Sequence, residues 1–422
     1  MVYKNKTRDS KKVLAILAGG GPAPGINGVI SAATIEAINQ GVEVIGILDG
    51  FKWIAEGDKG HIKRLSIEET SRIHLTGGSI IGISRENPTK SREKMKNVIK
   101  ILRELKVNYL LTIGGDDTMF SASRVLAEAN GRIKVAHVPK TIDNDLPLPG
   151  YISTFGFETA RHLGTRIVQY LMEDAKTTSR WYFVITMGRK TGHLALGIGK
   201  AAGATITIIP EQFTDRKITL NTLITLLEGA IIKRTNMGRQ DGVAIVAEGL
   251  AEKLEETDFE DLKDVERDAH GNIRLSEIDL GKVLKNETKR RLSEKGINIT
   301  IVNKNIGYEL RSAPPIPFDA KYTRDLGYGA IKFLLQGGTG AMITIQTGKM
   351  VPLNFKELLD PETGRTKVRY VDINTESYEV AEKYMIKLTR EDFHNKAKLR
   401  KLAQTAHMKP KEFVKYFSKA LR

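Results

Sequence analysis

Residues 110–118 read LLTIGGDDT, an apolar run followed by two glycines and two adjacent aspartates. A short apolar run bounded by glycines is typical of a buried strand. Two glycines after a strand let backbone amides approach a phosphate at the start of the next helix. Asp116 and Asp117 should repel that phosphate. The stretch therefore predicts a strand that ends at a phosphate site, where the two carboxylates have a further role.

The two aspartates have a chemical and a structural interpretation. A carboxylate just past a phosphate-binding turn can hold Mg²⁺, either directly or through its waters. Asp is also a favourable residue at the start of a helix, where no ligand is needed. We predict that Asp116 is a Mg²⁺ ligand, and the helix-start interpretation remains its alternative.

The order strand, glycine-rich turn and helix recurs along the chain. Residues 13–18 (VLAILA) predict a buried strand, 19–28 (GGGPAPGING) its turn, 29–39 a helix and 42–48 the next strand. Further strands are expected at residues 109–113, 133–138, 181–186, 205–209, 243–247, 297–302 and 341–345. This alternation predicts an α/β protein made of two Rossmann-like domains with mostly parallel sheets. Ligands in such folds bind beyond the carboxyl ends of the strands.

Composition limits the possible classes of protein. At 422 residues the chain is too long for one typical domain. It has no cysteine, which excludes disulfides, thiolate catalysis and zinc–cysteine sites. No apolar run approaches the roughly 18 residues of a membrane helix, and the early glycines do not suit a signal peptide. We therefore expect a cytoplasmic protein of enzyme size without a membrane partner.

The formal net charge of +16 is unevenly distributed. The segment from His394 to the end has nine Lys/Arg and one acid, Glu412, whereas residues 252–268 have nine acids and three bases. An RNA-binding tail is one interpretation, but the tail lacks interleaved aromatic residues at regular spacing and a recognisable nucleic-acid module. We expect a solvated basic helix, a solvated acidic segment and no nucleic-acid partner.

A third turn carries an unusual density of charge. Residues 139–145 read PKTIDND and follow the strand expected at 133–138. Asn and Asp suit an ordinary turn, but such a turn needs neither Lys140 nor the two carboxylates of Asp143 and Asp145. Their position at the sheet edge that also presents Asp116 favours a charged site.

Several motifs occur in an order that resembles the phosphofructokinase family. They are GGPAPGIN at 20–27, GGDDT at 114–118, TIDND at 141–145, MGR at 187–189, GH at 192–193, EG at 248–249 and GYELR at 307–311. The resemblance spans residues 20–311, and together the motifs are highly specific. Lipid and NAD kinases have a similar GGDG turn, but TIDND followed by MGR does not resemble them.

The resemblance also accounts for the second aspartate. ATP-dependent members have glycine at the positions of Asp117 and Lys140, and many have an acid at that of Pro22, so this chain looks like the diphosphate-dependent branch. A glycine leaves room for the α-phosphate and nucleoside of ATP, whereas the side chain of Asp117 fills that room and repels a third phosphate. Lys140 would balance Asp117 or contact diphosphate.

The implied reaction belongs to glycolysis: diphosphate and D-fructose 6-phosphate give fructose 1,6-bisphosphate and phosphate, reversibly and with Mg²⁺. The resemblance implies that Asp143 is the general base for the 1-hydroxyl of the sugar. Lys140, Asp117 and Arg189 complete the catalytic set, and Gly20, Arg85 and Lys140 bind the donor.

The resemblance further implies a set of contacts to the sugar. They are Thr141, Ile142, Asp143, Arg180, Met187, Gly188, Arg189, Glu248, Tyr308, Glu309, Leu310 and Arg311. Arg180 matches an arginine that reaches a neighbouring subunit, which implies a homo-oligomer, a dimer or a tetramer. Val302 departs from the pattern where a second such arginine aligns, and Lys304 is a candidate substitute. Tyr308 replaces a histidine.

We expect residues 1–150 to bind the donor, completed by a segment near 309–355, and residues 151–308 to bind fructose 6-phosphate. Residues 356–422 would form a C-terminal extension with the basic helical tail. Two alternatives remain: an ATP-dependent phosphofructokinase, and a catalytically silent protein that binds a metabolite or RNA.

Overall fold

The stretch 110–118 forms the end of strand β4 (Val107–Gly114) and the start of helix α5 (Asp116–Glu128) in the computed structural model. The structure describes residues 11–213, 218–259 and 279–418. The chain divides into two units, the first made of Met1–Ala160 with Tyr308–Arg369 and the second of Arg161–Gly307 with Tyr370–Arg422. The chain therefore passes between the units three times.

The sheet of the first unit has β4 near its centre. Its strand order is β12-β11-β5-β4-β1-β2-β3, and β6 (Phe155–Gly156) pairs with β5. Strands β1 (Val13–Ala18), β2 (Glu43–Ile47), β4, β5 (Lys134–Thr141) and β11 (Ala341–Gln346) run parallel. The edge strands β3 (Ile62–Arg64) and β12 (Lys349–Asn354) are antiparallel.

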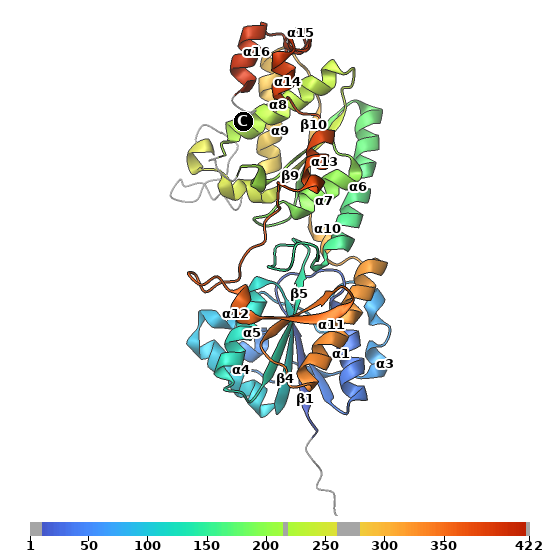
Figure 1. The fold of residues 1–422 in the computed structure, drawn as a ribbon, viewed down its shortest axis with the longest axis vertical. Helices are drawn as coiled ribbons and strands as arrows, with labels where there is room; N and C mark the ends of the chain where they lie inside the picture. Colours follow the sequence, from blue (N-terminus) through green and yellow to red (C-terminus); the bar gives the residue numbers. More distant parts are fainter. Residues whose placement is uncertain (1–10, 214–217, 260–278, 419–422) are drawn as a thin grey trace, which may run out of the picture. The chain divides into compact units, whose positions relative to one another are not determined.

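Helices cover both faces of this sheet (Figure 1). Helices α1 (Ile26–Asn39) and α11 (Pro317–Leu335) pack on one face, against side chains such as Leu14 and Ile16. Helices α4 (Arg92–Glu104) and α5 pack on the other, against Ala15 and Leu17. Successive strand residues point to opposite faces, so buried strands with two covered faces read as continuous apolar runs.

Short elements complete the first unit. They are α2 (Lys52–Ala55), α3 (Ile67–Thr70), η1 (Ile73–Leu75), η2 (Pro88–Lys90), α10 (Tyr308–Arg311) and α12 (Phe355–Leu358).

The second unit has a four-stranded parallel sheet in the order β10-β7-β9-β8. Its strands are β7 (Trp181–Thr186), β8 (Ile206–Ile208), β9 (Gly242–Ala247) and β10 (Ile301–Ile306). Its helices include α7 (His193–Ala202), α8 (Leu220–Asn236) and α9 (Leu280–Glu294), with short turns η3 (Pro210–Phe213), η4 (Glu248–Lys253) and η5 (Glu256–Phe259). Helix α6 (Phe157–Thr178) begins in the first unit and continues in the second.

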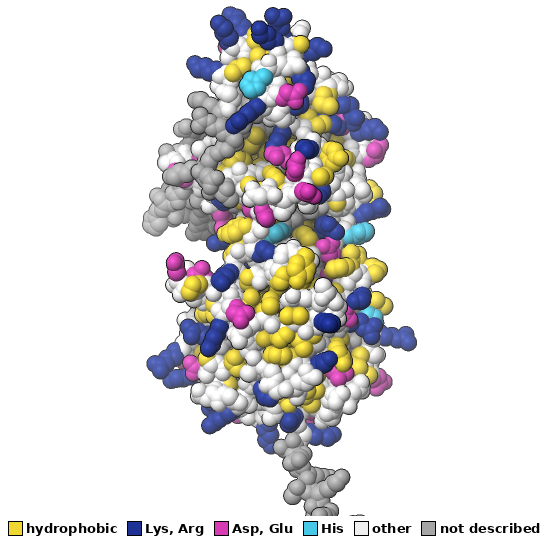
Figure 2. Space-filling model, in the orientation of Figure 1, with side chains coloured by type: hydrophobic (Ala, Val, Ile, Leu, Met, Phe, Trp, Pro, Cys, Tyr) yellow, Lys and Arg dark blue, Asp and Glu magenta, His cyan; other side chains and the backbone are white. Residues whose placement is uncertain are grey.

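The C-terminal segment is part of the second unit. Its helices are α13 (Glu376–Tyr384), α14 (Arg390–His394), α15 (Lys396–Thr405) and α16 (Pro410–Phe417). Phe413 and Phe417 are buried in the same core as α8, and the Tyr416 hydroxyl donates to the buried Glu228 carboxylate at 2.8 Å. Figure 2 shows lysines and arginines on the outer surface around α15 and α16. The basic face is solvated as expected, while the apolar face packs within the unit.

Several details differ from the sequence-based expectations. The strand expected at 297–302 is wrong in its bounds, because β10 begins at Ile301. Residues Ile297 and Ile299 lie in a loop and still pack against the core, which explains the apolar signal. The short strands β3, β6 and β12 were not expected. The first passage between units follows Ala160 and not residue 150, and residues 370–422 pack with the second unit. Residues 260–268 of the acidic segment lie outside the described residues.

Candidate active site

The first glycines after β1 bring three chain segments together. Gly20 has a φ of +89°, which favours glycine, and its amide donates to the carbonyl of Ser84 at 2.8 Å. A Cβ on Gly20 would lie 3.3 Å from the Lys140 ammonium. The structure thus places Gly20, the Ser84–Arg85 pair and Lys140 at one edge of the sheet, and their role as a donor site stays a prediction. Arg85 is exposed there.

The later glycines of the same loop have a structural role. A Cβ on Gly25, whose φ is +107°, would lie 2.6 Å from a methyl carbon of Thr323, and one on Gly28 would overlap the Thr323 hydroxyl. Both glycines therefore let α1 approach α11. Packing therefore requires Gly25 and Gly28, whereas Gly20 is the glycine of this turn that the resemblance assigns to the donor site.

The GGDDT turn starts a helix, as its structural interpretation predicted. Asp116 and Asp117 occupy the first turn of α5, where carboxylates interact favourably with the helix dipole. Thr118 is buried, and a Cβ on Gly114 would overlap it. Asp117 is exposed and Asp116 is half-buried. The helix start does not exclude a metal role, because the side chains remain accessible to a ligand.

His137 in β5 is a residue that the sequence reasoning missed. It is fully buried, with Nε2 3.0 Å from the carbonyl oxygen of Gly114 and Nδ1 2.8 Å from the Thr112 hydroxyl. A carbonyl only accepts, so Nε2 carries the proton and Nδ1 accepts from Thr112. Burial lowers the pKa of His137 to about 3. The neutral imidazole therefore ties the end of β4, where the GGDDT turn begins, to β5.

Lys140 is a buried cation of the first unit. It is 3% exposed, and its ammonium donates to the carbonyl oxygen of Gly21. Burial lowers the pKa of Lys140 to about 8, against the opposing effects of Asp143, Asp116 and Asp145. The lysine is therefore cationic at neutral pH inside a group of carboxylates. Its expected balance with Asp117 stays a prediction.

The turn at residues 141–145, here called the base turn, holds Asp143 by local hydrogen bonds. The Thr141 hydroxyl donates to Asp143 Oδ2 at 3.1 Å and accepts from the Asp143 amide at 3.0 Å. Asn144 has a φ of +58°, and its Oδ1 accepts from the Thr154 amide at 3.0 Å. Asn can adopt this left-handed conformation at modest cost, so the sequence TIDND builds a turn that presents Asp143.

Helix α10 lies with the donor residues of the first unit. A Cβ on Gly21 would lie 3.4 Å from the guanidinium carbon of Arg311, and Arg311 contributes to the lowered pKa of Lys140. Tyr308 is 76% exposed with its ring 5.0 Å from that guanidinium, and Leu310 is buried. Arg311 was expected among the sugar contacts. The structure places it beside Gly21, in the turn at residues 19–28 that is here called the glycine loop.

In the second unit, three turns follow neighbouring strands at the same level. Thr186, Ala247 and Ile306 are paired at the ends of β7, β9 and β10. The Glu248 carboxylate, just after β9, accepts from the amides of Gly188 and Arg189 at 3.0 and 2.8 Å. The MGR and EG motifs therefore meet through side chain and backbone.

Close packing explains further glycines at this edge. A Cβ on Gly249 would overlap the carbonyl oxygen of Arg189, and one on Gly307 would lie 2.8 Å from Met187 Cε. Arg189 itself has a φ of +54°. These contacts hold residues 187–189 in one place, as a binding loop requires.

Glu211 supports the same loop and was not anticipated. It is buried, and its two carboxylate oxygens lie 3.0 and 3.1 Å from the donating amide of Gly192, before α7. The Val371 amide also donates to it at 3.1 Å. Burial raises the pKa of Glu211, and these backbone donors oppose the effect.

Arg180 lies apart from the other sugar-site residues of the second unit. It precedes β7, whereas Met187 follows that strand, so about 20 Å of extended chain separate them. Its Nε lies 4.0 Å from Asp174. A site at the carboxyl ends of these strands therefore does not include Arg180 from the same unit.

The carboxylates around Lys140 suit one magnesium ion. Asp116, Asp143 and Asp145 all act on Lys140 electrostatically, so oxygen ligands gather at this edge. In the part of the chain that the structure describes, no three His, Cys, Asp or Glu side chains form a metal-binding group. Mg²⁺ is commonly held by one or two carboxylates together with phosphate oxygens of the substrate. The carboxylates of Asp116, Asp143 and Asp145 fit that arrangement.

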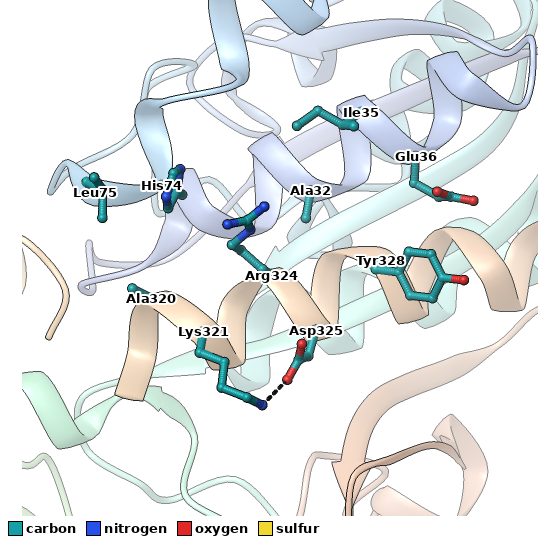
Figure 3. A pocket seen from close by; sticks show the side chains of 10 residues that line it. All are labelled: Ala32, Ile35, Glu36, His74, Leu75, Ala320, Lys321, Arg324, Asp325 and Tyr328. Atoms are coloured by element: carbon teal, nitrogen blue, oxygen red, sulfur yellow. Dashed lines mark hydrogen bonds and ion pairs between the residues drawn. The ribbon is translucent and has the colours of Figure 1, made fainter. Parts of the chain in front are cut away.

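A separate groove of about 560 Å³ lies between α1, η1 and α11 (Figure 3). Ala32 and Ile35 line it from α1, and Arg324 and Tyr328 from α11. The Lys321–Asp325 ion pair of 2.6 Å runs along α11. None of the predicted site residues lines this groove.

Comparison with known proteins identifies the family of this chain. The family model described as phosphofructokinase matches residues 13–334. The chain belongs to the phosphofructokinase family. It is 56% identical over 409 residues to the pyrophosphate–fructose 6-phosphate 1-phosphotransferase of Thermotoga maritima, covering 96% of this chain and 97% of that one. It is 49% identical to the protein of the same name from Naegleria fowleri, covering 96% and 94%.

Solved structures show the same fold at lower identity. The pyrophosphate-dependent phosphofructokinase of Nitrosospira multiformis has a TM-score of 0.69 at 17% identity, covering 95% of this chain and 93% of that one. The corresponding protein of Marinobacter aquaeolei has a TM-score of 0.67 at 18% identity, covering 94% and 92%. Among the described residues, no helix is both long and apolar enough to cross a membrane.

Proposed function

We propose that this chain transfers a phosphoryl group reversibly between diphosphate and the 1-hydroxyl of D-fructose 6-phosphate, as a diphosphate-dependent phosphofructokinase. The observation that carries the proposal is the position of Lys140, whose buried ammonium contacts the glycine loop beside Asp143. Two relatives above 45% identity carry the name of this activity. An ATP-dependent 6-phosphofructokinase of Streptomyces coelicolor is 30% identical, which makes that enzyme the second candidate.

In the forward reaction, the sugar 1-oxygen forms a bond to one phosphorus of diphosphate, and the bridging P–O bond breaks to release phosphate. The proton of the 1-hydroxyl passes to the Asp143 carboxylate. A positioned base of this kind contributes about 10²–10⁴ in rate. Thr141 orients that carboxylate through the 3.1 Å hydrogen bond.

Besides the base, phosphoryl transfer requires groups that neutralise the negative charge of the diphosphate donor. Lys140 and Arg311, both beside the glycine loop, would bind diphosphate together with the Gly20 backbone and Arg85. Asp116 would hold Mg²⁺, which would supply further positive charge to the phosphates. Arg189 would stabilise charge on the transferred group.

We propose that the loop of Met187, Gly188 and Arg189, together with Glu248, binds the sugar. Ile142, Tyr308, Glu309, Leu310 and Arg311 remain predicted sugar contacts. Arg180 precedes β7 and fits a role in a neighbouring subunit's site, so we also propose a homo-oligomer. A cytoplasmic location and the Mg²⁺ requirement are parts of the same proposal.

The choice of donor is testable with Asp117. Its exposed carboxylate stands in the first turn of α5, where it would repel and obstruct a third phosphate. We expect turnover of fructose 6-phosphate with Mg²⁺ and diphosphate, and little or none with ATP. Asp117→Gly should increase ATP use, because it removes both bulk and charge.

The measurement is kcat/KM for each donor, using wild type and Asp117→Gly. Comparable values for the two donors in the wild type would favour the ATP-dependent alternative. Turnover with neither donor would favour a silent metabolite-binding protein. A variant that gains no ATP activity would show that Asp117 does not select the donor.

A further inference from the structure

The loop of eleven residues 144–154 begins within the base turn and ends at β6, and several of its carbonyl groups accept hydrogen bonds from one side chain. Arg369 Nε and Nη2 donate to the carbonyl oxygen of Asn144 at 3.0 and 2.9 Å. Its Nη1 donates to the carbonyls of Ile152, Pro149 and Leu148 at 2.7, 3.2 and 3.3 Å. Nη2 also donates to the Asn144 side-chain oxygen. One guanidinium thus binds the backbone of four loop residues.

Within this loop, the Leu148 amide donates to the Leu146 carbonyl at 2.7 Å and the Ile152 amide to the Pro149 carbonyl at 2.9 Å, and Arg369 supplies donors to further carbonyls. Pro147 and Pro149 lack an amide hydrogen, and the side chains of Leu146, Leu148 and Ile152 are buried. Backbone carbonyls near a buried core must find donors. A guanidinium offers five N–H groups in a planar fork, which a lysine ammonium cannot reproduce.

The hydrogen bonds continue from Arg369 to Asp143. Asn144, which Arg369 holds at both its carbonyl and its side chain, follows Asp143 directly and binds the Thr154 amide. The Thr154 hydroxyl donates to the carbonyl of Thr141 at 2.7 Å, and Thr141 bonds Asp143. One connected network of hydrogen bonds, which begins at Arg369, therefore holds the base turn.

Arg369 belongs to a segment outside the recognised motifs. The family match ends at residue 334, and Arg369 comes 35 residues later. Its amide donates to the Asp145 carbonyl at 2.8 Å, and the Thr366 hydroxyl donates to the Asp116 carbonyl at 3.3 Å. Burial lowers the pKa of Arg369 to about 10, opposed by Asp145, so the guanidinium stays charged at neutral pH. The segment therefore contacts the turn of the proposed base, Asp143, and the turn of the proposed metal ligand, Asp116.

We propose that Arg369 is a positioning residue for phosphoryl transfer, which holds the base turn so that the Asp143 carboxylate can accept the sugar proton. The inference rests on the proposed function for its catalytic consequence. Its structural part, an ordered 141–154 segment that depends on Arg369, can be measured without activity.

The test compares Arg369→Lys and Arg369→Ala with Arg365→Ala, which removes an exposed arginine four residues earlier. A misplacement of about 1 Å in a catalytic group can cost about 10²-fold in rate. We expect a loss of this order in kcat for both Arg369 variants, with the Kd of diphosphate unchanged by calorimetry. Amide hydrogen exchange of peptides covering 141–154 should be faster in both, while strand β7 exchanges as in wild type. Methylguanidine should restore part of kcat to Arg369→Ala only.

Normal kcat in a folded Arg369→Lys, unchanged exchange of 141–154, or equal losses in Arg365→Ala would each overturn the inference. If the wild type uses no phosphoryl donor, the proposed function fails. The exchange experiment then still decides whether Arg369 fixes the base turn.

Discussion

Asp143 is held by hydrogen bonds that an asparagine could largely keep. Thr141 donates to its Oδ2 and accepts from its amide, and an Asn oxygen can accept from the same hydroxyl. Asp143→Asn should therefore fold and bind diphosphate while losing at least about 10² in kcat, because the proton acceptor is removed. Steady-state kinetics and diphosphate calorimetry on the same preparation test this. Activity near that of wild type would place the base elsewhere.

The lowered pKa of Lys140 predicts how kcat/KM for diphosphate depends on pH. Its folded pKa of about 8 lies below the ordinary value of 10.5, because burial disfavours the charged form. The free enzyme therefore loses this cation as the pH rises through about 8, while the unfolded chain keeps its proton up to about 10.5. We expect kcat/KM for diphosphate to fall by about tenfold per pH unit above that pKa, since the free-enzyme pKa governs this parameter.

Lys140→Met is the control for the pH profile. It should be less active throughout and should lack the alkaline decline assigned to the lysine. A wild-type profile without that decline would mean that the charge of Lys140 is not required for donor use.

At the scale of elements, the pair β4 and β5 depends on a neutral histidine. His137 has a folded pKa of about 3 against an ordinary value of 6.5. Its contribution to stability is present above pH 6.5 and is lost as the pH falls toward 3, because the unfolded chain binds the proton first. Each pH unit within this window is worth about 1.4 kcal/mol.

His137→Gln should therefore weaken the pH dependence of unfolding between about pH 6 and 4, by roughly 1 kcal/mol per unit. Denaturant unfolding at several pH values measures the slope, and the exposed His162→Gln is the matched control. Equal slopes in wild type and His137→Gln would show that His137 does not titrate on unfolding.

At the scale of the whole molecule, the basic C-terminal segment is a structural part of the second unit. Phe413 is 0% exposed and packs against Phe393 and Phe417. Phe413→Ala should destabilise this unit by about 3–5 kcal/mol, because it leaves a cavity in the core. Lys411→Ala, on the exposed side of α16, should have little effect.

The chain has two tryptophans, Trp53 in the first unit and the buried Trp181 in the second. In a Trp53→Phe background, the fluorescence of Trp181 reports unfolding of the second unit. Equal midpoints for Phe413→Ala and Lys411→Ala would show that the segment is an appendage without a share in the core.

The sequence by itself determined the alternation of strands and helices, the family and the main turns of the site. Each of these signals is local: apolar runs mark buried strands, and glycines and charges follow directly after them. The tertiary structure alone placed Arg311 beside the glycine loop, made His137 neutral, and assigned residues 370–422 to the second unit. It also brought Arg369 onto Asn144, 225 positions away. Such contacts depend on which strands become neighbours in the sheet, and no local pattern specifies that order.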